Sequence, residues 1–196
     1  MNRVILIDNG HGKETSGKRS PDGKLREYAW AREIASRIVN ALRKQGMDAR
    51  LLTPEENDIK VSERVKRANA ICREVGADKV LVVSIHINAA SEGKKWGSAR
   101  GFLSFIAPNA GSRSKRLARL LYDEAEQRGL QGNRWVTKEK YSVKSLGICR
   151  DTNCPAVLTE NLFMDNREDC AYLLSEGGKA TIAEVHVEAI LKYLDQ

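Results

Sequence analysis

Two continuous apolar runs constrain the fold of this chain more than any other feature of its sequence. Residues 4–7 and 80–83 carry only branched aliphatic side chains, a composition typical of strands buried on both faces. Asn9 and Gly10 follow the first run closely and end it. Strands buried on both faces need helices on both sides of their sheet, so the two runs predict an α/β fold.

Amphipathic helical patterns alternate with these runs and with further strand patterns. Apolar residues recur at helical spacing over residues 27–46, 61–75, 112–128 and 180–194, with a helical turn at 167–174. Short strands are predicted over residues 47–52, 101–106, 147–150 and 156–160, and polar connections over 13–26 and 129–145. The length of 196 residues suits one domain, and neither a repeat nor a linker divides the sequence. We therefore expect one domain over residues 1–196, with helices on both faces of its sheet.

The chain is basic, because 33 Lys and Arg outnumber 26 Asp and Glu and give a net charge of +7. Such a surface attracts anionic partners, among them cell walls, nucleic acid and anionic lipid. Most basic residues are interspersed with acidic ones. The exceptions are two local groups, one near the first apolar run and one after the second, namely Lys13, Lys18, Arg19 and Lys24, then Lys94, Lys95 and Arg100.

The cysteines and the N-terminus bear on the cellular compartment. The four cysteines include no C-x-x-C pair, which favours reduced, structural thiols over a disulfide framework. The first strand begins too near Met1 to leave room for a signal peptide, and no apolar run approaches membrane-spanning length. We therefore expect a cytoplasmic protein that does not bind membranes, or the mature form of an exported one.

Four side chains converge on one predicted edge of the sheet. His11 follows the first apolar run and His86 the second, while Glu160 ends a third strand and Glu27 begins the first helix. The carboxyl ends of parallel strands can be neighbours, and ligands bind there. Two histidines and one carboxylate suffice to hold a catalytic zinc ion, and a second carboxylate can then act as the base. The sequence lacks an H-E-x-x-H motif, so such a site would be assembled from distant segments.

Each of these residues also has a structural interpretation. Glu27 can complement the dipole of the helix that it begins, and Glu160 can be an ion-paired residue at a strand end. His186 lies among apolar residues of the last helical pattern, which favours a structural role.

Four segments carry a resemblance to a known family. Residues 7–12, Glu27, residues 84–89 and residues 155–166 read Ile-Asp-Asn-Gly-His-Gly, Glu, Ser-Ile-His-Ile-Asn-Ala and Pro-Ala-Val-Leu-Thr-Glu-Asn-Leu-Phe-Met-Asp-Asn. In this order they resemble the motifs of the zinc-dependent N-acetylmuramoyl-L-alanine amidases of the type 3 family. Asn161 and Leu162 depart from the small residue and glycine that are usual after the catalytic Glu, and we expect them to lie where substrate passes.

The resemblance implies a fold, a cofactor and a reaction. The fold is a single twisted, mostly parallel sheet of about six strands with flanking helices. One Zn²⁺ is held by His11, Glu27 and His86, a zinc-bound water attacks the amide between N-acetylmuramic acid and L-alanine, and Glu160 is the general base and acid. Gly10, Gly12 and Asn88 are candidate substrate contacts, although turn geometry and loop capping explain them equally well.

The same resemblance sets the expected partners. The expected substrate is peptidoglycan or muropeptides, and the expected enzyme is a monomer that acts on the cell wall after release. We expect neither nucleic acid nor a membrane as a partner, and no separate wall-binding domain. Two alternatives stay open. One is a zinc peptidase or amidase that acts on another peptide. The other is an inactive basic module that retains the fold and binds glycan or nucleic acid.

Overall fold

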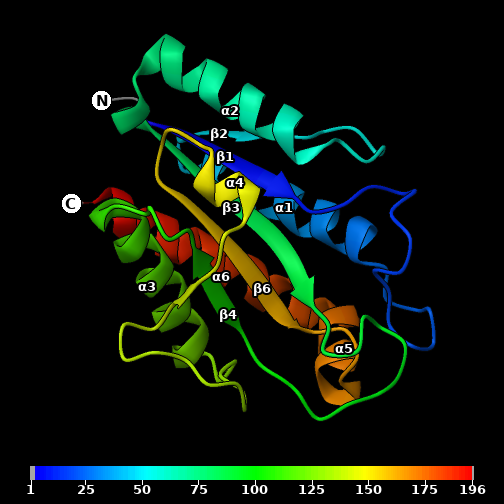
Figure 1. Cartoon of the computed structure of the whole chain (residues 1–196). Helices are drawn as coiled ribbons and strands as arrows, with labels where there is room; N and C mark the ends of the chain where they lie inside the picture. Colours follow the sequence, from blue (N-terminus) through cyan, green and yellow to red (C-terminus); the bar gives the residue numbers. More distant parts are fainter. Residues whose placement is uncertain (1–2, 196) are drawn as a thin grey trace.

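A six-stranded sheet runs through the protein, whose computed structural model describes residues 3–195 (Figure 1). The strands are β1 (Val4–Asn9), β2 (Asp48–Leu51), β3 (Val80–Asn88), β4 (Leu103–Ile106), β5 (Ser142–Val143) and β6 (Ala156–Phe163). Their order in the sheet is β2-β1-β3-β6-β4-β5. β2, β1, β3 and β6 are parallel, β4 is antiparallel to β6, and β5 is parallel to β4. The predicted single, mostly parallel sheet of about six strands is confirmed.

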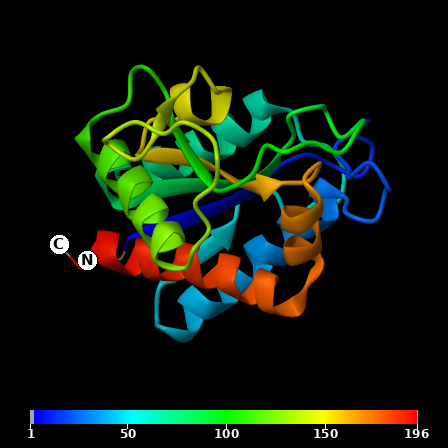
Figure 2. The ribbon, with the colours of Figure 1, turned by 90° about the horizontal axis from the view of Figure 1, so that it is seen from below.

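Helices cover both faces of this sheet, as the sequence predicts, and Figure 2 shows the strands between the two layers. One layer holds α1 (Glu27–Lys44), α3 (Ser112–Gln127), α5 (Arg167–Leu174) and α6 (Glu176–Leu194). The other layer holds α2 (Val61–Val75) and the short α4 (Gly147–Arg150), and a 3-10 turn, Ala77–Lys79, leads into β3. Among the described residues, no helix is both long and apolar enough to cross a membrane.

Side chains alternate between the two faces of the sheet along each strand, and this alternation decides which face His86 occupies. On β3, Leu81 and Val83 pack against the larger helical layer, whereas Val80 and Val82 pack on the side of α2. Successive strand residues point to opposite faces, so His86 points to the same face as Val82. β3 therefore directs His86 toward the layer that holds α2 and α4.

Several predicted boundaries were wrong. Residues 147–150 form helix α4 instead of a strand, because Arg150 N donates to Leu146 O over 2.8 Å. A run of four residues is too short for its apolar period to separate helix from strand. Strand β5 lies inside the segment predicted as a connection, and α6 begins at Glu176, before the predicted residue 180.

A bulge extends β6 beyond its predicted end. His86 pairs with Glu160, but Asn88 pairs with Phe163, so β6 holds one extra residue there. Within this bulge, Leu162 has φ of +64°. This left-handed conformation costs about 1–2 kcal/mol for a residue other than glycine. Asn161 and Leu162 are 0% and 3% exposed. The expectation that this pair lies where substrate passes was therefore wrong, since both side chains pack inside the protein.

Buried polar groups include His186 of α6 and the thiols. His186 is fully buried, with Nδ1 2.8 Å from Ile182 O and Nε2 2.9 Å from Thr159 Oγ1. Burial lowers the pKa of its imidazole to about 4, against the hydrogen bond to Ile182. All four cysteines are free and buried. These groups have the structural roles that the sequence predicts.

Replacing His186 by Gln should flatten the pH dependence of stability. The unfolded chain binds a proton at His186 below its ordinary pKa of 6.5, and the folded chain does so only below about 4. The wild-type protein therefore loses up to about 3 kcal/mol of unfolding free energy from this residue as the pH falls between these values. Denaturant unfolding at pH 7 and pH 4.5 measures the difference between wild type and His186→Gln. A pH-independent difference would contradict the assignment.

Candidate metal centre

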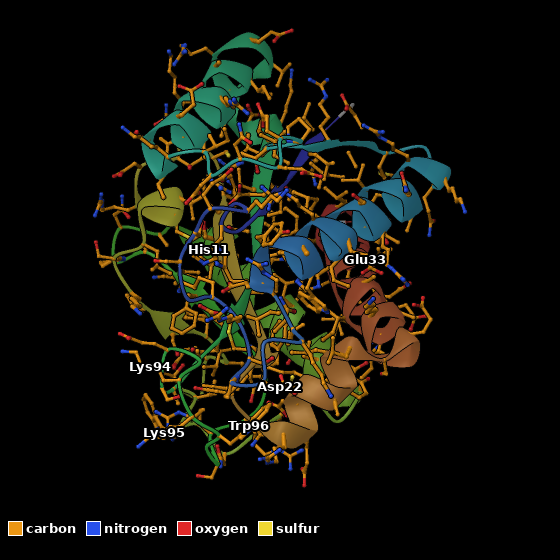
Figure 3. All side chains as sticks on the ribbon, turned by 90° about the vertical axis from the view of Figure 1, so that its right-hand side faces the viewer. His11, Asp22, Glu33, Lys94, Lys95 and Trp96 are labelled. Atoms are coloured by element: carbon orange, nitrogen blue, oxygen red, sulfur yellow. The ribbon has the colours of Figure 1, made fainter. Side chains whose placement is uncertain are left out.

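Three side chains meet at the carboxyl edge of the sheet, where Figure 3 shows His11 beside the start of α1. His11 follows β1 by two residues, His86 lies in β3, and Glu27 is the first residue of α1. Glu27 Oε1 is 3.4 Å from His11 Nε2 and 3.1 Å from His86 Nδ1. The two imidazole rings are nearly perpendicular, with centroids 5.0 Å apart. The fold thus brings together the three side chains that the sequence suggested as metal ligands.

The geometry of these atoms fits a zinc ion. One ligand atom from each of the three residues lies within 4.8 Å of the other two. Ligands that lie about 2.0–2.1 Å from a tetrahedral zinc are about 3.4 Å apart, close to the distances observed here. Glu27 Oε2 is buried and has no hydrogen-bond partner in the described part of the chain. An orphaned carboxylate oxygen beside two imidazoles is a donor set suited to Zn²⁺.

The hydrogen bonds of this cluster fix its charge. Burial by itself would raise the pKa of Glu27, but hydrogen bonds with His11 and His86 outweigh it and hold that pKa well below its usual range. Burial would likewise lower the pKa of His86, and the hydrogen bond to Glu27 raises it instead. Ile87 N also donates to Glu27 Oε1 over 3.0 Å. Glu27 is therefore ionised, the form in which a carboxylate binds metal.

Glu160 lies beside this cluster on the neighbouring strand, in register with His86. Its Oε2 atom is buried and has no hydrogen-bond partner among residues 3–195. Burial raises the pKa of Glu160 to about 7, although the nearby His86 opposes the shift. A carboxyl group with a pKa near neutrality can both take up and release a proton.

A buried ion pair supports the turn that carries His11. Asp8 and Arg64 are 1% and 3% exposed, and Arg64 Nη1 lies 2.7 Å from Asp8 Oδ1. Ser84 Oγ donates to the other Asp8 oxygen over 2.5 Å. His11 has φ of +60°, and its carbonyl accepts from Arg32 Nη1 over 2.9 Å and from Arg64 Nη2 over 3.5 Å. Arginines from α1 and α2 thus hold His11 in a left-handed conformation.

These supporting residues were missed from the sequence. Asp8 gave a weak signal as a charged residue directly after a buried run, and Arg64 gave one as a cation among the apolar positions of a helix. Asn161 also acts here, because its Nδ2 donates to His86 O over 2.9 Å. Nothing in one sequence indicates which backbone carbonyl a buried amide will reach.

The three candidate substrate contacts have local packing roles in the structure. A Cβ on Gly10 would overlap the His86 imidazole, and a Cβ on Gly12 would overlap the backbone of Asp58. Asn88 Oδ1 accepts a hydrogen bond from Ala89 N over 2.9 Å, which caps the loop after β3. Close approach and loop capping account for these residues, and their contact with substrate stays a prediction.

A hollow of about 590 Å³ opens beside His11 and His86, on the face of α2 and α4. Most of its exposed surface is apolar, from residues such as Ile59, Val61 and Leu158, although Asp58, Lys60 and Arg64 also line it. The volume is typical of a small-molecule site. The histidines at its edge therefore face a space that a substrate can enter.

The sequence profile of the family described as N-acetylmuramoyl-L-alanine amidase matches residues 5–192. The endolysin of Bacillus phage SPP1 is 29% identical over 197 residues, which cover 100% of this chain and 67% of that protein. The N-acetylmuramoyl-L-alanine amidase CwlM of Bacillus licheniformis is 28% identical, over 96% of this chain and 67% of the relative. The chain thus spans about two thirds of the length of these relatives.

Solved structures share the fold. The catalytic domain of the amidase CwlV from Bacillus (Paenibacillus) polymyxa var. colistinus superposes with a TM-score of 0.80 at 24% identity, over 98% of both chains. The amidase Ami1 from Mycobacterium smegmatis gives a TM-score of 0.85 at 19% identity, over 100% of this chain and 99% of that chain. At these identities the likeness shows the fold alone.

Replacing Gly10 by Ala should weaken zinc binding. The added Cβ overlaps the His86 imidazole, so the ring must leave its place opposite Glu27. We expect about a ten- to hundredfold loss of affinity, as when other supports of a metal ligand are removed. Competition with a chromophoric chelator measures it. Gly111→Ala is the matched control, since its Cβ would meet nothing within 4 Å, and equal affinities for the two variants would refute the prediction.

Replacing Arg64 by Met should destabilise the protein, because Asp8 is then buried without its partner. The expected loss is about 3–5 kcal/mol of unfolding free energy. Denaturant unfolding gives the value. The double variant Asp8→Asn, Arg64→Met should lose less than the sum of the two single variants, and simple additivity would show that the pair is not coupled.

Proposed function

The chain belongs to the N-acetylmuramoyl-L-alanine amidase family, and from this premise we propose that it is a zinc enzyme that cleaves the amide between N-acetylmuramic acid and L-alanine in peptidoglycan. His11, Glu27 and His86 are the zinc ligands, and Glu160 is the catalytic carboxylate. The phage endolysin and CwlM, which match this chain almost from end to end, support a role in breaking down the cell wall.

One observation carries this proposal. Two imidazoles and the ionised Glu27 converge at one edge of the sheet, where Glu160 lies in register with His86. Glu27 Oε2 and Glu160 Oε2 are both buried without a hydrogen-bond partner in the described chain. Buried carboxylate oxygens without partners are costly. A metal ion and a reacting water account for both of them.

The residues divide the chemistry between them. When bound, Zn²⁺ supplies a water of lowered pKa, about 7, and polarises a carbonyl oxygen. Glu160 takes a proton from the attacking water as it adds to the lactyl carbonyl carbon. Glu160 then returns this proton to the nitrogen of L-alanine as the C–N bond breaks. The products are a carboxylic acid on the lactyl group and a peptide with a free amine.

The sheet and its two helical layers form the proposed catalytic domain, which acts on peptidoglycan or muropeptides at the cell wall. The site is built entirely from this one chain, since the turn after β1 and the elements β3, β6 and α1 supply its side chains. We propose that a monomer is sufficient for activity.

Digestion of purified muropeptides tests the reaction. We expect mass spectrometry to find intact stem peptides with a free L-alanine amine, and a chelator to stop their release. Glu160→Gln should keep its zinc and lose at least about a hundredfold in rate, since general acid and base catalysis contributes about 10²–10⁴-fold. Glu74→Gln, an exposed position on α2, is the matched control and should retain wild-type activity.

The outcomes separate the alternatives. Cleavage between other residues of the stem would indicate a peptidase. Binding of glycan without products and without a zinc requirement would indicate an inactive binding module. Full turnover by Glu160→Gln would remove this residue from the mechanism.

A further inference from the structure

A second hollow lies beyond the carboxyl ends of β3 and β6. It has a volume of about 620 Å³ and lies between two loops, residues 16–21 and residues 89–94, with Met164 at its base. Figure 3 shows Lys94 on the same side of the molecule as His11, with the chain that follows His11 running toward Asp22. The hollow is as large as typical small-ligand sites, and the proposed reaction does not use it.

Close contacts hold the two walls of this hollow in place. The backbone of Gly93 packs so near Arg19 O that a Cβ there would overlap it. Asp165 is 1% exposed and anchors the second loop, accepting from Ala90 N over 3.1 Å and from Ser91 N over 2.6 Å. In the first loop, Ser20 Oγ accepts from Leu25 N over 3.0 Å. The walls are therefore formed before a ligand arrives.

The hollow is positively charged. Lys18, Arg19 and Lys94 line it against a single carboxylate, that of Glu92. Lys94 Nζ lies 2.6 Å from Glu92 Oε2, so this pair is neutral. Within residues 3–195, Lys18 and Arg19 have no carboxylate partner within ion-pair distance and are exposed. Two unpaired cations in a preformed hollow favour an anionic ligand.

The loop that forms one wall of the hollow is bonded to a residue of the metal centre. Glu27 N donates to Lys18 O over 3.0 Å, so the loop that carries the two cations is fixed to the residue that begins α1. One wall of the basic hollow therefore lies beside the metal centre, whereas the hollow beside α2 exposes mainly apolar surface.

We infer that the basic hollow binds the stem peptide of the substrate through a free carboxylate on the residue after L-alanine. This inference rests on the proposed function. The second residue of a stem peptide is a γ-linked D-glutamate, whose α-carboxyl group is either free or amidated. The N-acetylated glycan is neutral, and its lactyl and acetyl methyl groups suit the apolar hollow. Charge thus fixes the direction in which the substrate lies across the centre.

The arrangement favours a peptide over a wall polyanion. A polyphosphate chain is bound by an extended basic surface that follows it. Here the unpaired cations are two adjacent residues inside one hollow, on a loop whose backbone is hydrogen-bonded to Glu27. That geometry suits a single carboxylate better than a long anionic chain.

Two synthetic muramyl tripeptides test this inference, identical except that the second residue is D-glutamate or D-isoglutamine. The zinc-loaded wild type should have about a three- to tenfold higher kcat/KM on the free acid, mainly through KM, as two exposed ion pairs of up to about 1 kcal/mol each imply. The double variant Lys18→Gln, Arg19→Gln should bring the ratio close to 1, mainly by raising KM on the free acid. Salt should reduce the wild-type preference, because the cations are exposed.

Lys66→Gln is the matched control, because Lys66 is an exposed cation on α2 with a side chain 78% exposed, and it should keep the wild-type ratio. A ratio unchanged in the double variant, or an equal loss on both substrates, would overturn the inference. Loss of binding to teichoic-acid-bearing walls by the double variant, without any preference between the tripeptides, would instead indicate a polyanion site.

A binding measurement separates this inference from the proposed function. Calorimetric titration of the Glu160→Gln protein with the two peptide products, L-Ala-γ-D-Glu-L-Lys and its amidated form, needs no turnover. The free acid should bind about three- to tenfold more tightly, and the Lys18, Arg19 changes should abolish the difference. Selective peptide binding by a protein inactive on every muropeptide would refute the proposed function alone. Equal affinities would refute the carboxylate site alone.

Discussion

The buried ion pair between Asp8 and Arg64 is the interaction on which the geometry of the candidate metal centre depends. A desolvated pair of this kind adds little net stability, but it fixes α2 against the end of β1 and aims Arg64 at the His11 carbonyl. His11 needs that support, because its left-handed backbone costs about 1–2 kcal/mol. Arg32 supplies a second hydrogen bond to the same carbonyl. Backbone strain at one proposed metal ligand is thus offset by hydrogen bonds from two helices.

A second strained backbone segment supports the site on the neighbouring strand β6. The bulge in β6 leaves Leu162 in a left-handed conformation and turns the Asn161 amide toward His86 O. Glu160 stays in register with His86 on the other side of that bulge. His11 and Glu160 therefore lie beside backbone irregularities of their own turn and strand, and the sheet core behind them is regular. The strained residues lie at the site, as expected where the surrounding structure has to enforce one geometry.

The sequence predicted the larger elements well, because each carries several turns or a full apolar run. The helices α1, α2 and α3 and the strands β1 and β3 were expected near their observed positions. It was wrong at residues 147–150 and overlooked β5, since four and two residues hold too little periodicity to decide between states. The set of His11, Glu27 and His86 could be proposed because metal ligands are restricted to few residue types. Arg64, Arg32 and Asn161 could not, because their hydrogen bonds reach backbone carbonyls, which have no signature in sequence.

By itself, then, the sequence determined the α/β class, the alternation of strands and helices, and the set of residues that we propose as zinc ligands. Local chemistry is enough for those conclusions, since apolar period and ligand type are properties of short segments. Only the tertiary structure decided that the imidazoles face Glu27 Oε1, that Glu27 Oε2 and Glu160 Oε2 lack partners, and that Lys18 and Arg19 share a hollow with Lys94. These relations join residues up to about 150 positions apart in the chain, and strand register and loop packing alone set their distances.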